Sequence, residues 1–219
     1  VYQRGHKCFI TVTKKQSKAK RDSVGTCKSS SLIYCTDQVN ADELAASIGH
    51  SNNSNRINPQ NFGMNLILSE TKDTYGGSLL GTWVCSDGHA LAYTYLLNKS
   101  EYWSILRVRN INNIMGGNSH NSTTADESID VLSDGLHAAS TSVAWLDAKI
   151  GFFYTKLEGS SKMSSGSDGT HCVCFHRLGT SQTSDIVVYR ANTTVTKTTK
   201  NTNREFLSIE ITVDSRCLL

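Results

Sequence analysis

The sequence predicts an α+β fold with a mainly antiparallel sheet. Two segments have the apolar spacing of helices, and most strand-like segments follow one another as hairpins rather than as regular strand–helix–strand units. The chain has 219 residues, of which 38% are hydrophobic and 19% charged, so it is large enough to bury a core and too apolar to be disordered. We expect a basic N-terminal arm over residues 1–24 and one globular domain over residues 25–219.

Two helices are predicted. The first lies within residues 36–50, where acidic residues fill the early turns and Gly49 ends the helix. The second lies within residues 125–151 and is the longest candidate. The apolar side chains that share one side are Val39, Leu44, Ala45 and Ile48 in the first helix, and Ile129, Leu132, Leu136 and Ala139 in the second.

The strands are predicted between and after these helices. A hairpin is expected around the tight turn at residues 86–88, with one strand through Trp83 and Cys85 and the other over residues 89–97. The other expected strands lie within residues 62–70, 152–158, 185–191 and 204–217. Residues 100–115 fit a helix or a strand, and the alternation at Trp103, Ile105 and Arg107 favours the strand. Because neighbouring strands are joined mainly by turns, we expect them to pair antiparallel.

Seven cysteines raise the question of their role. They are Cys8, Cys27, Cys35, Cys85, Cys172, Cys174 and Cys217. The segment HCVCFH at residues 171–176 holds the ligand types of a zinc site, but on a strand His171 points to the opposite face from Cys172. A redox pair needs a C-x-x-C spacing, which the chain lacks. Structural disulfides are therefore the favoured interpretation.

A C-x-C pair suits structural disulfides. Both sulfurs lie on one face of a strand, so Cys172 and Cys174 would join two separate segments to that strand. Cys27 and Cys35, which flank a serine-rich segment interpreted as a turn, supply two partners.

The remaining pair is then Cys85 with Cys217. Seven is an odd number, so Cys8 is left over. An odd cysteine in a secreted chain indicates a free thiol or an intermolecular bond, here to a second subunit or to a second copy of the chain.

The net charge of +3 is unevenly spread. Residues 1–28 carry eight Lys or Arg against Asp22 alone, which leaves the rest of the chain net acidic. Such an arm would dock on an anionic lipid, a cell-wall polymer or an acidic partner, or would be a solvated terminus. The residues expected to make surface contact are Lys14, Lys15, Lys18, Lys20, Arg21 and Lys28.

Several features favour a secreted, processed protein. No apolar run approaches the roughly 20 residues that cross a bilayer, and the chain starts at Val1 without an initiator Met. Seven cysteines favour an oxidising compartment. Four segments fit the N-glycosylation acceptor pattern, at Asn52, Asn98, Asn121 and Asn192.

Short motifs occur in one order along residues 25–217 and carry a resemblance to a known family. They are GTCKSSSLIYC before the first helix, WVCSDGHALAYTYL, the second helix, HCVC, and a last strand FLSIEITVDSRC. In this order the chain resembles the fungal killer toxins of the killer protein 4 type and related secreted effector domains.

The resemblance implies an α/β sandwich in which an antiparallel sheet packs against two helices. It also implies three disulfides: Cys27 with Cys172, Cys35 with Cys174, and Cys85 with Cys217. Long insertions near residues 98–125 and 150–170 depart from the family pattern, and Trp83 stands where the family carries a lysine implicated in blocking calcium uptake. The resemblance therefore implies the fold but not the calcium mechanism.

Catalysis is the main alternative. Asp87 and His89 lie on one turn, and His137, His171 and His176 are also available for a secreted hydrolase such as a ribonuclease. No nucleophile elbow, phosphate loop or His-Glu-x-x-His motif accompanies them. The three tryptophans, Trp83, Trp103 and Trp145, are expected in the core rather than in a sugar-binding site.

The expected function is therefore that of a secreted, non-catalytic toxin or effector. It would bind a cell-wall or membrane component of a competing cell and inhibit its growth. Nucleic-acid binding is not expected, because the body of the protein is net acidic. No cofactor or metal is expected either. A secreted hydrolase and a disulfide-linked subunit of a larger assembly are the alternatives.

Overall fold

A computed structural model describes residues 2–4, 7–15, 29–36, 63–97, 102–112, 128–159, 169–191, 207, 209–211 and 217–218. Within these residues the regular structure is almost entirely β. Three sheets of four strands follow one another along the chain, and in each sheet the strands pair in sequence order as an antiparallel meander. A short two-stranded pair follows the third sheet.

The strands have the following bounds. Sheet 1 contains β1 (Tyr2–Arg4), β2 (Lys7–Lys15), β3 (Ser29–Thr36) and β4 (Asn65–Ser69). Sheet 2 contains β5 (Ser78–Val84), β6 (Ala90–Leu96), β7 (Ile105–Asn110) and β8 (Ser128–Leu132). Sheet 3 contains β9 (Val143–Asp147), β10 (Gly151–Glu158), β11 (Thr170–Arg177) and β12 (Ile186–Arg190). The last pair is β13 (Glu210–Ile211) and β14 (Cys217–Leu218).

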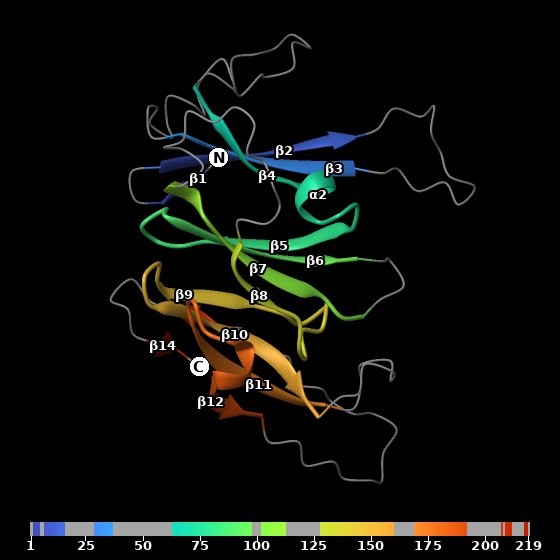
Figure 1. Ribbon diagram of the computed structural model, residues 1–219, viewed down its shortest axis with the longest axis vertical. Helices are drawn as coiled ribbons and strands as arrows, with labels where there is room; N and C mark the ends of the chain where they lie inside the picture. The colour runs from blue at the N-terminus through green and yellow to red at the C-terminus, as the bar shows by residue number, and fades with distance from the viewer. Residues whose placement is uncertain are drawn as a thin grey trace, which may run out of the picture.

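The three sheets are stacked in chain order along the long axis of the molecule (Figure 1). One cluster of buried apolar side chains joins sheets 1 and 2, and a second joins sheets 2 and 3. The first strands also meet, because β5 contacts β9 and β9 contacts β13. The core is therefore a series of layers between sheets, and the first strands of sheets 2 and 3 lie on the same side of the stack.

The predicted hairpin at residues 86–88 is confirmed. It joins β5 to β6, and Cys85 and Gly88 close the turn through backbone hydrogen bonds, Cys85 N to Ala90 O and Gly88 N to Cys85 O, both 2.9 Å. Gly88 has a φ of 76°, a conformation that favours glycine. Strands predicted around residues 62–70, 100–115, 152–158 and 185–191 are also present, as β4, β7, β10 and β12. Within residues 204–217 the described strand residues are 210–211 and 217.

The predicted α+β class is wrong, and so is the sandwich with two helices. The second predicted helix, within residues 125–151, contains β8 and β9 instead. In β8 the exposed Ile129 and Val131 alternate with the buried Asp130 and Leu132, which is the period of a strand. The described helices α2 (Glu70–Asp73) and η3 (Gln182–Ser184) have four and three residues.

The first predicted helix is only partly covered by the structure. Thr36, at the start of the range predicted for this helix, is the last residue of β3, and residues 37–50 lie outside the described residues. Neither described helix is long and apolar enough to cross a membrane.

The serine-rich segment interpreted as a turn is a strand. Ser29–Thr36 form β3, which pairs with β2 on one side and β4 on the other. Ile33 and Cys35 are buried and alternate with the half-buried Leu32 and Tyr34. The alternation of these four residues, rather than the serines before them, determines the local structure.

Candidate functional site

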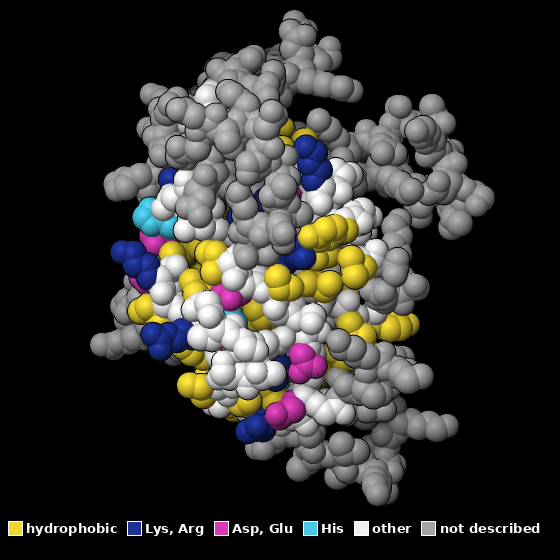
Figure 2. Space-filling model, viewed as in Figure 1, with side chains coloured by type: hydrophobic (Ala, Val, Ile, Leu, Met, Phe, Trp, Pro, Cys, Tyr) yellow, Lys and Arg dark blue, Asp and Glu magenta, His cyan; other side chains and the backbone are white. Residues whose placement is uncertain are grey.

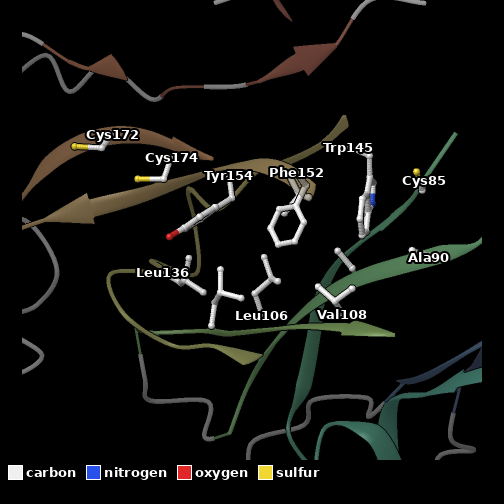
Figure 3. Close-up of a cluster of buried hydrophobic side chains, with 13 residues drawn as sticks. Cys85, Ala90, Leu106, Val108, Leu136, Trp145, Phe152, Tyr154, Cys172 and Cys174 are labelled. Atoms are coloured by element: carbon white, nitrogen blue, oxygen red, sulfur yellow. The ribbon is translucent and has the colours of Figure 1, made fainter. Parts of the chain in front are cut away.

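The interface between sheets 2 and 3 is packed with aromatic side chains. Phe152 of β10 points toward Leu106 and Val108 of β7, and Tyr154 of β10 points toward Leu136 (Figure 3). Phe152 and Tyr154 are fully buried, and Phe152 lies edge-on to Trp145, with ring centroids 5.2 Å apart. Such pairs add to the stabilisation from burial alone.

A buried histidine lies in the same interface. His176 of β11 is fully buried, and its Nδ1 lies 2.7 Å from Oδ1 of Asp185. Its Nε2 lies 3.5 Å from Oδ2 of Asp130, which belongs to β8 of sheet 2. Burial lowers the pKa of His176, but the hydrogen bonds and charges of the two carboxylates outweigh it and raise that pKa to about 9. His176 is therefore an imidazolium held between the two sheets at neutral pH.

Further hydrogen bonds surround this ion triad. The Tyr154 hydroxyl donates to Oδ2 of Asp185 at 2.7 Å, and burial together with this bond raises the pKa of Tyr154. Gln182 Nε2 donates to the Tyr154 hydroxyl and to the carbonyl of Asp134, while Gln182 Oε1 accepts from the amides of Ser133 and Asp134. These hydrogen bonds join the turn between β11 and β12 to Ser133 and Asp134, which follow β8 directly.

A second buried ion pair joins sheets 1 and 2. Arg109 of β7 donates through Nη2 to Oδ1 of Asp73 at 2.7 Å and through Nη1 to the carbonyl of Ile67 at 2.8 Å. The other oxygen of Asp73 accepts from the amide of Ser69. Both charged side chains are about nine-tenths buried. Burial of this pair is tolerated because each charge has more than one partner.

The chemistry open to these two clusters is limited. His176 is enclosed on every side, so it cannot reach a substrate from solvent. In the part of the chain that the structure describes, no group of His, Cys, Asp and Glu side chains is arranged to hold a metal ion. The clusters join adjacent sheets, and we take these inter-sheet interfaces as the functional feature of the described residues.

Successive four-stranded meanders whose first strands contact one another are the arrangement of blades in a β-propeller. The family model of the prolyl oligopeptidase N-terminal β-propeller domain matches residues 67–216, which is most of the chain. The chain belongs to this β-propeller family. Sheets 1, 2 and 3 correspond to three propeller blades.

Solved propeller proteins show the same fold. A prolyl endopeptidase studied for inter-domain dynamics in catalysis and specificity has a TM-score of 0.53 and 18% identity, over 87% of this chain and 22% of its own. Prolyl oligopeptidase B from Galerina marginata, bound to a 35mer hydrolysis and macrocyclization substrate, has a TM-score of 0.55 and 18% identity, over 84% of this chain and 23% of its own. The chain thus spans less than a quarter of these proteins. No curated protein sequence matches it.

The resemblance to fungal killer toxins is wrong. The family match and the propeller blades replace it, and with it the prediction of a toxin that binds a cell wall or membrane. The motifs that suggested the toxin are short strand and turn patterns. Many β-rich proteins contain such patterns, because they reflect local hairpin geometry.

The predicted disulfides are also wrong where the propeller structure describes them. Cys35, Cys85, Cys172 and Cys174 are buried, and none of these four forms a disulfide bond. Cys35 packs between blades 1 and 2, whereas Cys174 packs between blades 2 and 3, so this predicted pair cannot form. Burial raises the pKa of Cys172 to about 11, as expected for an unreactive thiol.

One prediction about these cysteines is confirmed. Cys172 and Cys174 share a face of β11 and enter one cluster, whereas Val173 enters another cluster on the opposite face of the sheet. The side chains of Cys8, Cys27 and Cys217 lie outside the described residues, so the role predicted for Cys8 stays a prediction.

The other predicted site residues are dispersed over the propeller. His89 Nδ1 lies 3.4 Å from Asp87 Oδ2 in the β5–β6 turn, so the Asp-Gly-His segment is a hairpin turn there. His137 stacks on Tyr102, and His171 is buried on β11. The side chains of Lys14, Lys15, Lys18, Lys20, Arg21 and Lys28 and the acceptors Asn52, Asn98, Asn121 and Asn192 lie outside the described residues.

Two of the three tryptophans, Trp83 and Trp145, lie in or against the interface between blades 2 and 3. Trp145 is buried, and its indole donates to the carbonyl of Trp83 at 2.8 Å, which joins β9 to β5. Trp103 is half-buried and packs its edge against His137. Sequence reasoning missed Asp130 and Asp185, because nothing near either residue in the sequence marks it as a partner of a histidine on another strand.

Proposed function

We propose that the chain supplies three blades of the non-catalytic propeller of a peptidase that acts on peptides. The observation that carries this proposal is the match of residues 67–216 to the propeller domain of prolyl oligopeptidases, together with three meanders stacked by their faces. The solved relatives are named as prolyl peptidases, and this chain corresponds to less than a quarter of each.

The outer face of blade 3 supports a larger propeller. Val173, Ala144 and the half-buried Phe153 lie on that face, and Leu207 and Ile209 pack against them. Ile209 directly precedes β13, which contacts β9, so the covering segment leads into a further strand pair. In the same way, β9 of sheet 3 contacts β5, the first strand of sheet 2.

The buried polar groups agree with a structural role. His176 and Arg109 are each committed to carboxylates across a blade interface. In such a protein these blades would hold their shape while another part of the polypeptide supplies the catalytic groups.

The test uses the native protein. An antibody raised against the recombinant 219-residue chain is used to precipitate the native polypeptide, which is sized on a reducing gel and assayed with an internally quenched proline-containing peptide. We expect a polypeptide several times larger than 24.0 kDa and co-precipitating cleavage of the peptide. The recombinant chain alone, assayed in parallel, should show no cleavage. A native polypeptide of 24.0 kDa, or a large one without activity on any proline-containing peptide, would contradict the proposal.

A further inference from the structure

The two ring nitrogens of His176 face carboxylates that belong to different blades. Nδ1 lies 2.7 Å from Oδ1 of Asp185, which directly precedes β12 of blade 3. Nε2 lies 3.5 Å from Oδ2 of Asp130, on β8 of blade 2. His176 is fully buried, and histidine side chains contribute little to the face of the molecule shown in Figure 2. We call Asp130, His176 and Asp185 the His176 triad.

Only the charged form of the ring offers a donor to both carboxylates. An imidazolium has two N–H donors, whereas a neutral imidazole has one N–H donor and one lone pair. If the His176 ring lost its proton, one of the two carboxylates would face a lone pair in a buried site. A buried carboxylate that loses its partner is strongly destabilising.

The geometry indicates which of the two hydrogen bonds would be lost. The bond to Asp185 is the shorter one, and the other oxygen of Asp185 accepts from the Tyr154 hydroxyl at 2.7 Å. These three side chains all belong to blade 3, so their hydrogen bonds can persist with a neutral ring. Asp130 would retain the amide of Gly179, at 2.9 Å, but would face the lone pair. Loss of the proton therefore weakens the contact between the blades more than the structure within blade 3.

The other titratable groups described in this interface stay mainly neutral below a pH of about 10. Burial raises the pKa of Tyr154 on β10 and that of Cys174 on β11. Burial also raises the pKa of Cys85 and that of Cys172 to about 11. The pKa of His176 is about 9, so its charge is the one that changes between pH 7.5 and pH 10.

The interface between blades 1 and 2 is held by an ion pair that does not titrate in this range. Arg109 pairs with Asp73, and an arginine stays charged throughout the range. Burial raises the pKa of Tyr93, in the same interface, to about 12. The two interfaces should therefore respond differently to rising pH.

We propose that the His176 triad is a pH-sensitive switch that opens the interface between blades 2 and 3 when the ring loses its proton, while the interface between blades 1 and 2 stays closed. The opening is local, because the carboxylate that loses its donor lies in one interface. It exposes the apolar cluster that contains Cys174, which is two residues from His176 and pairs across the sheet with Tyr154 (Figure 3). This inference goes beyond the proposed function, because it concerns an interface within the chain and requires no other part of a peptidase.

Two buried cysteines report on the two interfaces within one molecule. Cys174 packs between blades 2 and 3, and Cys35 packs between blades 1 and 2. The 219-residue chain is incubated for a prolonged time with iodoacetamide at pH 7.5 and at pH 10, without denaturant, and the alkylation rate of each cysteine is measured by peptide mass spectrometry. Dividing the rate of Cys174 by that of Cys35 removes the general effect of pH on thiol reactivity. We expect this ratio to rise at least tenfold between the two pH values.

Two variants separate the switch from other effects of pH. Asp130→Asn removes the carboxylate of blade 2, so a neutral ring meets no charge across the interface, and the ratio should rise less than twofold. His89→Gln, at an exposed histidine in the β5–β6 turn, should show the same rise as the unmodified chain.

Two results would overturn the proposal. A ratio that stays constant in the unmodified chain would show that the two interfaces open together or that neither opens, and this result requires no variant. A tenfold rise that persists in Asp130→Asn would show that the triad does not control the opening. The antibody test of the proposed function involves none of these residues, so failure of either experiment leaves the other result intact.

Discussion

The Nε2 of His176 on one blade lies 3.5 Å from Oδ2 of Asp130 on the next. The two residues are far apart in the sequence, and the contact crosses the interface between sheets 2 and 3. Because Asp185 binds the other ring nitrogen at 2.7 Å, the histidine is charged and holds two carboxylates that would otherwise repel each other.

This triad predicts that the chain becomes less stable as pH rises above neutrality. The pKa of His176 is about 9 in the folded protein, against about 6.5 for an unperturbed histidine. Its contribution is therefore complete below pH of about 6.5 and is lost as pH rises through about 9. We expect the free energy of unfolding, from urea titrations at several pH values, to fall by on the order of 2–3 kcal/mol over this range.

Two variants test the assignment of this pH dependence. His176→Gln should be less stable than the unmodified chain at pH 6, and its free energy of unfolding should no longer fall as pH rises. His89→Gln, at an exposed histidine in the β5–β6 turn, should keep this pH dependence. A slope that persists in His176→Gln would show that another group titrates.

Removing one partner of the Arg109–Asp73 pair should be costly. Asp73→Ala leaves the Arg109 guanidinium buried without its carboxylate, and we expect a loss of about 3–5 kcal/mol in the free energy of unfolding. The double variant with Arg109→Met should recover part of the loss, because no unpaired charge remains. Glu158→Gln is the control, since it breaks a solvent-exposed pair with Arg190 and should have little effect. Additive losses in the double variant would contradict a direct coupling.

Gly88 and Gly179 form a matched pair for backbone strain. Both have a φ of 76°, but a Cβ at Gly88 would lie 2.6 Å from the carbonyl oxygen of Arg4, whereas nothing lies within 4 Å at Gly179. We expect Gly179→Ala to cost about 1 kcal/mol from conformation alone, and Gly88→Ala to cost about 1–3 kcal/mol more because blade 1 must shift. Thermal unfolding of both variants measures the difference. Equal losses of stability would mean that the close approach to the Arg4 carbonyl oxygen adds no cost at Gly88.

Phe152 should be the residue whose truncation most weakens the interface between blades 2 and 3. It is fully buried and contacts the rings of Trp145, Tyr154 and His176. Phe152→Ala should lower the free energy of unfolding by about 3–5 kcal/mol through lost burial and a cavity. Ile186→Ala, at a side chain that is 64% exposed, should change it by less than about 0.5 kcal/mol. Comparable losses would place Phe152 outside the core.

The buried thiols should react only after unfolding. Cys35, Cys85, Cys172 and Cys174 are buried and not joined in disulfide bonds, and burial raises the pKa of Cys172 to about 11. We expect iodoacetamide at pH 8 to leave these four unlabelled in the native chain and to label them in 8 M urea without any reductant, as read by peptide mass spectrometry. Labelling that requires a reductant would restore the disulfide prediction.

Local patterns in the sequence predicted much of the strand content. The hairpin around Gly88 was found because a turn at residues 86–88 separates two apolar strands, and Cys172 and Cys174 were placed on one face by the two-residue period of a strand. Both properties depend on residues close together in the chain, so the sequence alone determined them.

The choice between helix and strand was less certain from pattern alone. Ile129, Leu132 and Leu136 fit the spacing of a helix, yet β8 forms because it pairs with β7 and places Leu132 in the interface between blades. The helix prediction failed because pairing with a distant strand outweighs local spacing.

Only the tertiary structure decided how the sheets stack and which polar groups meet between them. Asp130, Asp185 and His176 belong to different strands and turns, and the stacking of blade 3 on blade 2 brings them together. Likewise, the sequence permitted a disulfide between Cys35 and Cys174, but the two side chains are buried in different interfaces and do not form one. The sequence by itself determined strands, turns and side-chain faces, because these follow from neighbouring residues. The partners across each interface follow from packing between distant segments, which local patterns do not encode.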